Sequence, residues 1–133
     1  MKKLFAVFGL ILVLSMALAA CGGGSSGGAN TLNISMSDFA FSPSSWSVTA
    51  GSSVTVTLKN TGAVPHTWTV MSKAVSGTYS DAHKANVLFD SGPIDAGASK
   101  TVTFTAPAAG TYQVICTQSG HFENGMVGQL TVK

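Results

Sequence analysis

Three short segments of the chain alternate strictly between apolar and polar residues, at 54–58, 101–105 and 130–133. Period-two alternation that is rich in Val and Thr predicts half-buried β-strands. Turn signals containing Gly, Asn or Pro separate these segments from weaker strand candidates. The weaker candidates are Thr31–Ser37, Trp46–Thr49, Thr67–Met71 and Tyr112–Cys116. About eight short strands with closely spaced turns predict an all-β fold, a Greek-key β-sandwich or barrel.

The segment 74–86 breaks this pattern because its residues are mostly polar or small. We interpret it as a polar excursion on the surface between two strands, with room for a short helix. His83 lies in this excursion, and we expect it to be a solvated surface histidine. Trp46 and Trp68 lie in strand candidates, and we expect both to belong to the core or its margin.

The first twenty residues have a different character. Lys2 and Lys3 precede an almost uninterrupted apolar run, from Leu4 to Ala17, that ends in small residues. This arrangement is typical of a secretory signal, and the run is at the short end for a membrane-spanning helix. We therefore predict that residues 1–20 are a signal peptide. An uncleaved membrane anchor is the alternative.

The signal is followed by a cysteine and a glycine-rich stretch. The run Leu18-Ala19-Ala20-Cys21 resembles the bacterial lipobox, and the resemblance implies that Cys21 is acylated and becomes the first mature residue. Several acyl chains on one residue anchor a protein firmly to a membrane. Residues 22–30 are mostly Gly and Ser, a composition that behaves as flexible coil. We predict a lipidated Cys21 with a tether over 21–30, and one folded domain over 31–133.

The formal net charge changes once the predicted signal peptide is removed. The chain has seven lysines and arginines together, against five acidic residues. Without Lys2 and Lys3 the balance is five against five, so the mature protein is formally neutral. No basic patch remains, which argues against nucleic-acid binding.

The folded domain contains a single cysteine, Cys116, although the export signal predicts an oxidising compartment where cysteines usually pair. A lone thiol there can be a metal ligand, a nucleophile, an intermolecular bridge or an inert buried residue. Cys116 begins the pattern C-x4-H-x4-M, which continues with His121 and Met126 just before the final strand. A further histidine, His66, lies upstream in the run Asn60-Thr61-Gly62-Ala63-Val64-Pro65-His66-Thr67-Trp68.

These two segments resemble the cupredoxins, the small type 1 blue-copper electron carriers, and within them the auracyanin- and azurin-like variants. The resemblance implies that His66, Cys116, His121 and Met126 hold one copper ion, Cu(I) or Cu(II). Two imidazoles and a thiolate with a weak axial thioether form an electron-transfer copper site. The family commonly has asparagine after the first histidine, and its side chain ties the ligand loops together. Thr67 stands there in this chain, and its shorter reach predicts a weaker link.

Strand parity supports the same site independently. His66 shares a strand face with Trp68, Cys116 shares one with Val114, and Met126 shares one with alternate residues of the last strand. In each case a candidate ligand continues an apolar face. Three of the four residues could therefore point into the same end of the sandwich, with His121 completing the set from the rim.

The resemblance implies a function in which one electron is shuttled between membrane-associated redox proteins, such as a cytochrome, an oxidase, a reductase or a photosynthetic complex. We expect a monomer that is not an enzyme, anchored by lipid outside the cytoplasm, in the periplasm or at the cell surface. Three alternatives stay open. They are a copper-delivery lipoprotein, a metal-free β-sandwich surface lipoprotein, and a nucleophilic Cys116 with a histidine base.

Overall fold

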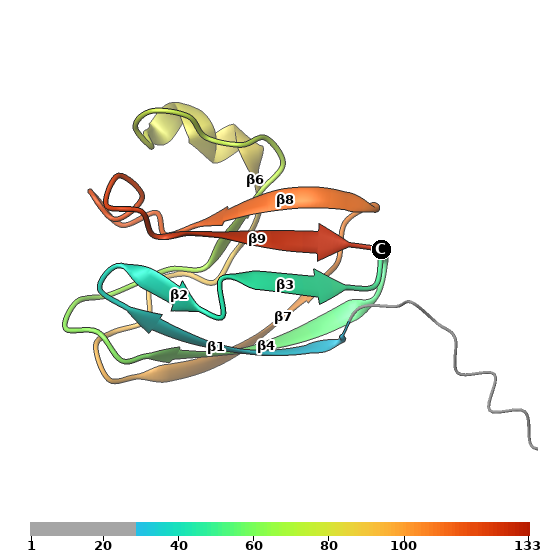
Figure 1. Cartoon of the computed structure of the whole chain (residues 1–133), viewed down its shortest axis with the longest axis horizontal. Helices are drawn as coiled ribbons and strands as arrows, with labels where there is room; N and C mark the ends of the chain where they lie inside the picture. Colours follow the sequence, from blue (N-terminus) through green and yellow to red (C-terminus); the bar gives the residue numbers. More distant parts are fainter. Residues whose placement is uncertain (1–28) are drawn as a thin grey trace, which may run out of the picture.

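The computed structural model describes residues 29–133, which form a two-layered β-sandwich (Figure 1). The predicted signal peptide, the predicted lipidation site Cys21 and nearly all of the predicted tether lie outside the described residues. One sheet has four strands in the order β2-β1-β4-β7. Their bounds are β1 Thr31–Ser37, β2 Ala40–Ser42, β4 Ser53–Asn60 and β7 Ser99–Thr105.

The second sheet has five strands in the order β3-β9-β8-β5-β6. Their bounds are β3 Ser45–Val48, β5 Thr69–Met71, β6 Val87–Asp90, β8 Gly110–Ile115 and β9 Val127–Val132. The chain crosses between the sheets after β2, β3, β4, β6 and β7. As a result β1 runs parallel to β4 and β3 runs parallel to β9, while the other pairs are antiparallel.

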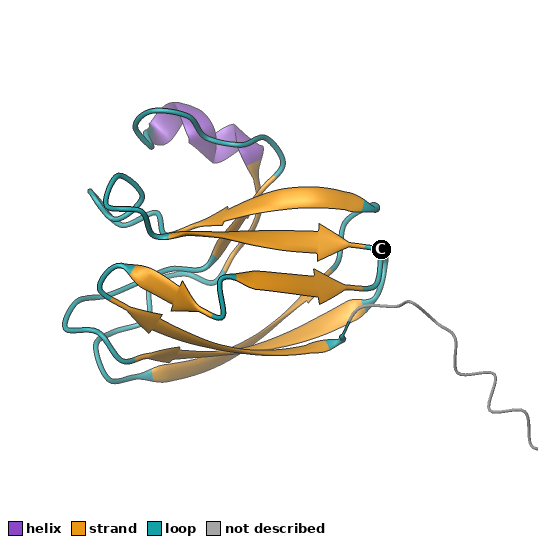
Figure 2. Ribbon diagram, viewed as in Figure 1, coloured by secondary structure: helices purple, strands orange, loops and turns teal. Residues whose placement is uncertain are grey.

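The all-β sandwich prediction is confirmed, with nine strands in the described residues where about eight were expected. The strands β2 and β6 were not predicted, because β2 has only three residues and β6 begins with three consecutive apolar residues, so neither shows alternation. The predicted polar excursion contains the 3-10 helix η1, Asp81–Asn86, which has no buried residue. Figure 2 shows it standing apart from the strands.

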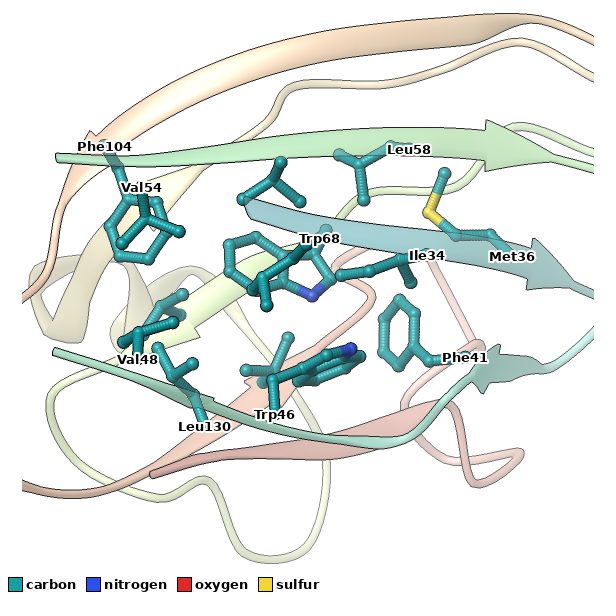
Figure 3. Packing of buried hydrophobic residues seen from close by; sticks show 14 of the residues in the cluster. Ile34, Met36, Phe41, Trp46, Val48, Val54, Leu58, Trp68, Phe104 and Leu130 are labelled. Carbon is teal, nitrogen blue, oxygen red and sulfur yellow. The ribbon is translucent and has the colours of Figure 1, made fainter. Parts of the chain in front are cut away.

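The core lies between the sheets and is built from the alternating positions that the sequence pattern indicated. Leu32, Ile34 and Met36 of β1 are buried while their neighbours are not. The indole of Trp68 is fully buried at the centre, between the two layers (Figure 3). Its ring centroid lies 5.7 Å from that of Trp46 and 5.6 Å from that of Phe104. Both tryptophans are therefore core residues, as predicted.

The ends of the described chain lie at one end of the sandwich, and the two loops with the predicted ligands lie at the other. The backbone N–H of Ala29 donates to Ser47, and that of Lys133 donates to Val48, so both ends of the described chain lie beside the end of β3. The loop between β4 and β5 and the loop between β8 and β9 extend from the opposite end (Figure 1). No helix within residues 29–133 is long and apolar enough to cross a membrane.

Gly128 in β9 provides a test of this packing. A Cβ atom there would lie 2.6 Å from the ring of Trp46 and 2.8 Å from the carbonyl oxygen of Ser44. We predict that Gly128→Ala lowers the free energy of unfolding by about 1–3 kcal/mol, because overpacking displaces the indole. Denaturant titration followed by tryptophan fluorescence measures this.

Gly110→Ala is the matched control, since Gly110 is also a strand glycine and neither residue has a positive φ. A Cβ at Gly110 would meet Tyr112 at an ordinary 3.5 Å. Equal stability of the two variants would contradict the packing argument.

Candidate metal centre

Three predicted ligands come together at the end of the sandwich that carries the two loops. His66 lies between β4 and β5, where its backbone exchanges hydrogen bonds with Ile94 of 3.1 Å and 2.9 Å. Cys116 follows the last residue of β8, and His121 lies in the loop that leads to β9. Their ligand atoms, two imidazole nitrogens and one sulfur, all lie within 4.8 Å of one another.

The two histidines present the same ring nitrogen to the cluster. Nδ1 of His66 lies 3.1 Å from Nδ1 of His121. The Sγ atom of Cys116 lies 3.3 Å from Nδ1 of His121 and 3.9 Å from Nδ1 of His66. The three atoms thus form a compact triangle of two imidazole nitrogens and one sulfur.

This triangle fits a single small metal ion. First-row metals such as zinc bind imidazole nitrogen at about 2.0 Å and thiolate sulfur at about 2.3 Å, so three donors around one ion lie roughly 3 to 4 Å apart. The observed separations of 3.1, 3.3 and 3.9 Å agree with this spacing. Soft thiolate suits Cu(I) and imidazole suits copper in both oxidation states, so the donor set matches copper.

Met126, the predicted axial ligand, is fully buried immediately before β9. Its carbonyl oxygen accepts a hydrogen bond of 3.2 Å from the backbone of Cys116, and its N–H donates to His121 at 3.1 Å. Its side chain belongs to the same buried cluster as Cys116. Its backbone therefore joins two members of the triangle, and its role as a ligand stays a prediction.

The loop that holds His121 needs glycine at two positions. Gly120 and Gly125 adopt φ of 80° and 89°, a region that L side chains rarely enter. Between them, the backbone N–H of Asn124 donates to Gly120 and that of Gly125 donates to Phe122. These bonds close the loop compactly, so that His121 is turned back toward Cys116.

Burial sets the protonation of the cysteine and of one histidine in this cluster. The thiol of Cys116 is fully buried, and desolvation raises its pKa, against the hydrogen bonds from the Thr67 and Gln118 backbones. Desolvation likewise lowers the pKa of His121, assisted by the neighbouring His66. His121 is therefore neutral near pH 7 and able to bind a metal, whereas Cys116 must lose a proton to do so.

Thr67 joins the two ligand segments. Its backbone N–H donates to Sγ of Cys116 at 3.3 Å, and its hydroxyl accepts the backbone N–H of Thr117 at 2.8 Å. The hydroxyls of Thr67 and Thr117 also lie 3.0 Å apart. Threonine therefore retains a link between the loops where the family commonly has asparagine; whether the link is weaker stays a prediction.

Asn60 organises the loop that leads to His66. This fully buried side chain donates to the carbonyl oxygens of Val64 and Ile94 at 2.8 and 2.9 Å, and it accepts the backbone N–H of Gly62 at 2.8 Å. All three of its hydrogen bonds go to backbone, so the loop has one defined path. In the sequence, Asn60 stood out only as the first residue of the run that leads to His66.

Two consecutive residues of the β1–β2 turn contact the two histidines, and sequence analysis missed both. The carboxylate of Asp38 lies 2.7 Å from Nε2 of His66, and the ring of Phe39 lies 4.7 Å from that of His121. The backbone N–H of Ala63 donates to Asp38, and this hydrogen bond is the main cause that lowers the pKa of the carboxyl. The contact with His66 lowers the pKa further, by a smaller amount. An acidic residue beside an aromatic one in a turn has no signature that would have identified either.

The polar excursion is tied to the ligand loop rather than being wholly on the surface. The backbone N–H of Tyr79 donates to Glu123 at 2.9 Å, and Val75 is buried. His83 is partly exposed, accepts the backbone N–H of Ser80 and stacks on Tyr79, away from the triangle. The expectation for His83 holds, whereas the excursion as a whole contributes Val75 to a small second core.

The raised pKa of Cys116 predicts how metal-free stability depends on pH. The ordinary thiol pKa is 9.0, so the unfolded chain loses this proton near pH 9 while the folded chain keeps it. Above that pH the folded state binds more protons, and the free energy of unfolding must fall as pH rises. We expect denaturant titrations from about pH 7 to pH 10 to show a steeper fall for the wild type than for Cys116→Ser. If the free energy of unfolding fell equally with pH in both proteins, the raised pKa of Cys116 would be contradicted.

Comparison with known proteins agrees with this geometry. The family model described as copper binding proteins, plastocyanin/azurin family, matches residues 29–133. Auracyanin-A of Chloroflexus aurantiacus is 34% identical over 154 aligned residues, covering 95% of this chain and 94% of that protein.

Solved structures give the same result. A dithionite-reduced auracyanin from the photosynthetic bacterium Roseiflexus castenholzii superposes with a TM-score of 0.70 at 29% identity, covering 80% of this chain and 99% of that one. Auracyanin A of Chloroflexus aurantiacus, described as a "blue" copper protein, superposes with a TM-score of 0.66 at 33% identity, covering 77% of this chain and 98% of that one. The match of the family model over the whole described domain shows that this chain belongs to the copper-binding plastocyanin/azurin family, the cupredoxins.

Proposed function

We propose that the chain is a type 1 blue-copper protein that shuttles one electron between membrane-associated redox partners. One copper ion would be held by His66, Cys116, His121 and Met126. The observation that carries this proposal is the triangle of two Nδ1 atoms and one Sγ atom, all within 4.8 Å, in a chain of a copper-binding family.

Copper held there would supply the one-electron chemistry by alternating between Cu(I) and Cu(II). The protein's part is to keep the donors in place in both states. Burial of His66 and Cys116 excludes water, and the Thr67 N–H directed at Sγ stabilises the thiolate. Because the loops are cross-linked independently of any ion, little rearrangement would oppose electron transfer.

His121 is the ligand closest to solvent, with 9% of its surface exposed. The ring of Phe39, which is 37% exposed, packs against it. Exposed or partly exposed residues of the two ligand loops would complete this face: Ala63, Val64, Pro65, Phe122 and Gly125. A small, weakly polar face suits brief redox encounters. The neutral balance of the mature chain argues against strong electrostatic steering.

The same proposal includes a site of action outside the cytoplasm. Acylation of Cys21 would hold the domain at the membrane surface, in the periplasm or at the cell surface, with the glycine-rich tether setting its reach. Its partners would be a cytochrome, an oxidase, a reductase or a photosynthetic complex, and the protein would act as a monomer without catalytic activity of its own.

The alternatives are less well supported. A nucleophilic Cys116 needs an accessible thiolate, but this thiol is fully buried and its pKa is raised. A copper-delivery protein must release its ion readily, whereas two of the three clustered donors are fully buried. A metal-free surface lipoprotein would not explain why two imidazoles and a thiol are packed together in one cluster.

Copper loading tests the site directly. We expect a chain of residues 22–133 to develop an intense blue thiolate-to-copper absorption when Cu(II) is added, and to show reversible one-electron voltammetry. Cys116→Ser should abolish the colour because the charge-transfer donor is lost. His83→Ala, which removes a histidine outside the triangle, should keep it. A blue Cys116→Ser variant would reject the ligand assignment, and irreversible voltammetry would favour copper delivery.

Membrane attachment tests the anchor. In cells that express the full chain, the wild type should sediment with membranes, whereas Cys21→Ala should not, because it lacks the thiol that carries the lipid. Cys116→Ser is the control, since it removes a thiol from the domain and should leave attachment unchanged. Membrane association of Cys21→Ala would show that another segment provides the anchor.

A further inference from the structure

We propose that Asp38 is a positioning residue for the copper centre. Its carboxylate would hold His66 in the tautomer that leaves Nδ1 free to bind copper, and its negative charge would lower the reduction potential. This inference rests on the proposed function and extends it to a residue outside the ligand set. It is carried by one contact, the 2.7 Å approach of Asp38 Oδ1 to Nε2 of His66.

The geometry assigns opposite tasks to the two nitrogens of His66. Nδ1 faces His121 and Cys116, at 3.1 and 3.9 Å, and must keep its lone pair free to bind a metal. The ring proton must then sit on Nε2, where Asp38 is the hydrogen-bond acceptor. The His66 ring is fully buried, so within the described chain this carboxylate is the partner that decides which nitrogen carries the proton.

Asp38 is itself held in place. Its second oxygen, Oδ2, accepts the backbone N–H of Ala63 at 2.8 Å, in the loop that leads to His66. The carboxylate therefore bridges the loop and the ring, and 29% of its side chain stays exposed. A carboxylate fixed at both oxygens can orient the imidazole before any metal arrives.

Gly62 provides the space for this contact. A Cβ atom on Gly62 would overlap Oδ1 of Asp38 and lie 2.8 Å from Nε2 of His66. Its φ is not in the positive region, so the space, rather than backbone freedom, explains the glycine. The absence of a side chain at Gly62 is therefore a requirement of the carboxylate–imidazole contact.

The two histidines consequently differ in their surroundings. His66 has a carboxylate on its outer nitrogen, whereas the ring of His121 packs edge-on against Phe39, and none of its hydrogen bonds in the described chain goes to a carboxylate. A carboxylate behind a ligand histidine raises the basicity of that ligand. It therefore favours the more positive Cu(II) state, and the potential is lower than it would be without Asp38.

Three variants test the proposal on the mature chain from residue 21, carrying Cys21→Ala to keep it in solution. Asp38→Asn retains the shape and removes the charge, Asp38→Ala removes the acceptor, and Gly62→Ala separates the pair while leaving the charge. Asp95→Asn is the matched control, because this exposed carboxylate contacts neither histidine. Thermal unfolding checks that each variant is folded.

We expect the reduction potential to rise in all three variants and to change much less in Asp95→Asn. Cu(II) affinity should fall about 10- to 100-fold in Asp38→Ala, the usual effect of removing such a partner. The readout without copper is nitrogen NMR of the metal-free protein at about pH 8, where histidine is ordinarily neutral. It should show the His66 proton on Nε2 in the wild type and a mixture of tautomers in Asp38→Ala.

The proposal is overturned if Asp38→Asn and Asp95→Asn have the same potential, since Asp38 would then only fasten the loop through Ala63. It is also overturned if the metal-free wild type carries the His66 proton on Nδ1. A wild type that never turns blue would instead defeat the proposed function, and the NMR comparison would still decide whether Asp38 sets the tautomer of His66.

Discussion

The antiparallel pairing of β5 with β8 is the contact on which the metal centre depends. The register sets Thr69 opposite Ile115 and Val70 opposite Val114. Continued by two residues, the same register brings Thr67 to Thr117, where the hydroxyl of one accepts the backbone N–H of the other. A slip by one residue would turn every side chain to the opposite face and separate His66 from Cys116.

The core makes that register difficult to change. Trp68 and Val70 on one strand and Val114 and Cys116 on the other are all fully buried in one cluster between the sheets, so a slip would remove large apolar side chains from the packing that fits them. Packing therefore positions the donors, and the hydrogen bonds of Thr67 and Asn60 orient them. The site is assembled by the fold itself, which is the condition for a centre that must accept two oxidation states without rearranging.

The surroundings of the two imidazoles divide their tasks. His66 is fully buried against a carboxylate, whereas His121 reaches the surface beneath an aromatic ring. In the proposed function, the first would stabilise bound metal and the second would face a partner. Both neighbours come from one turn, at Asp38 and Phe39, although that turn is remote in sequence from either histidine.

Alternation along the sequence was enough to predict the clearly patterned strands and the all-β class, and the resemblance of two segments to the cupredoxins implied the residues of the donor triangle. Both signals are local: apolar residues at every second position mark a strand, and each family motif lies within one segment, around His66 or from Cys116 to Met126. The folded structure was needed to find that Asp38 and Phe39 contact the histidines, that Gly62 leaves room for the carboxylate, and that Glu123 fastens the excursion to the ligand loop. These contacts join segments that the sandwich brings together from distant parts of the chain, and no local pattern records which distant segment will become a neighbour.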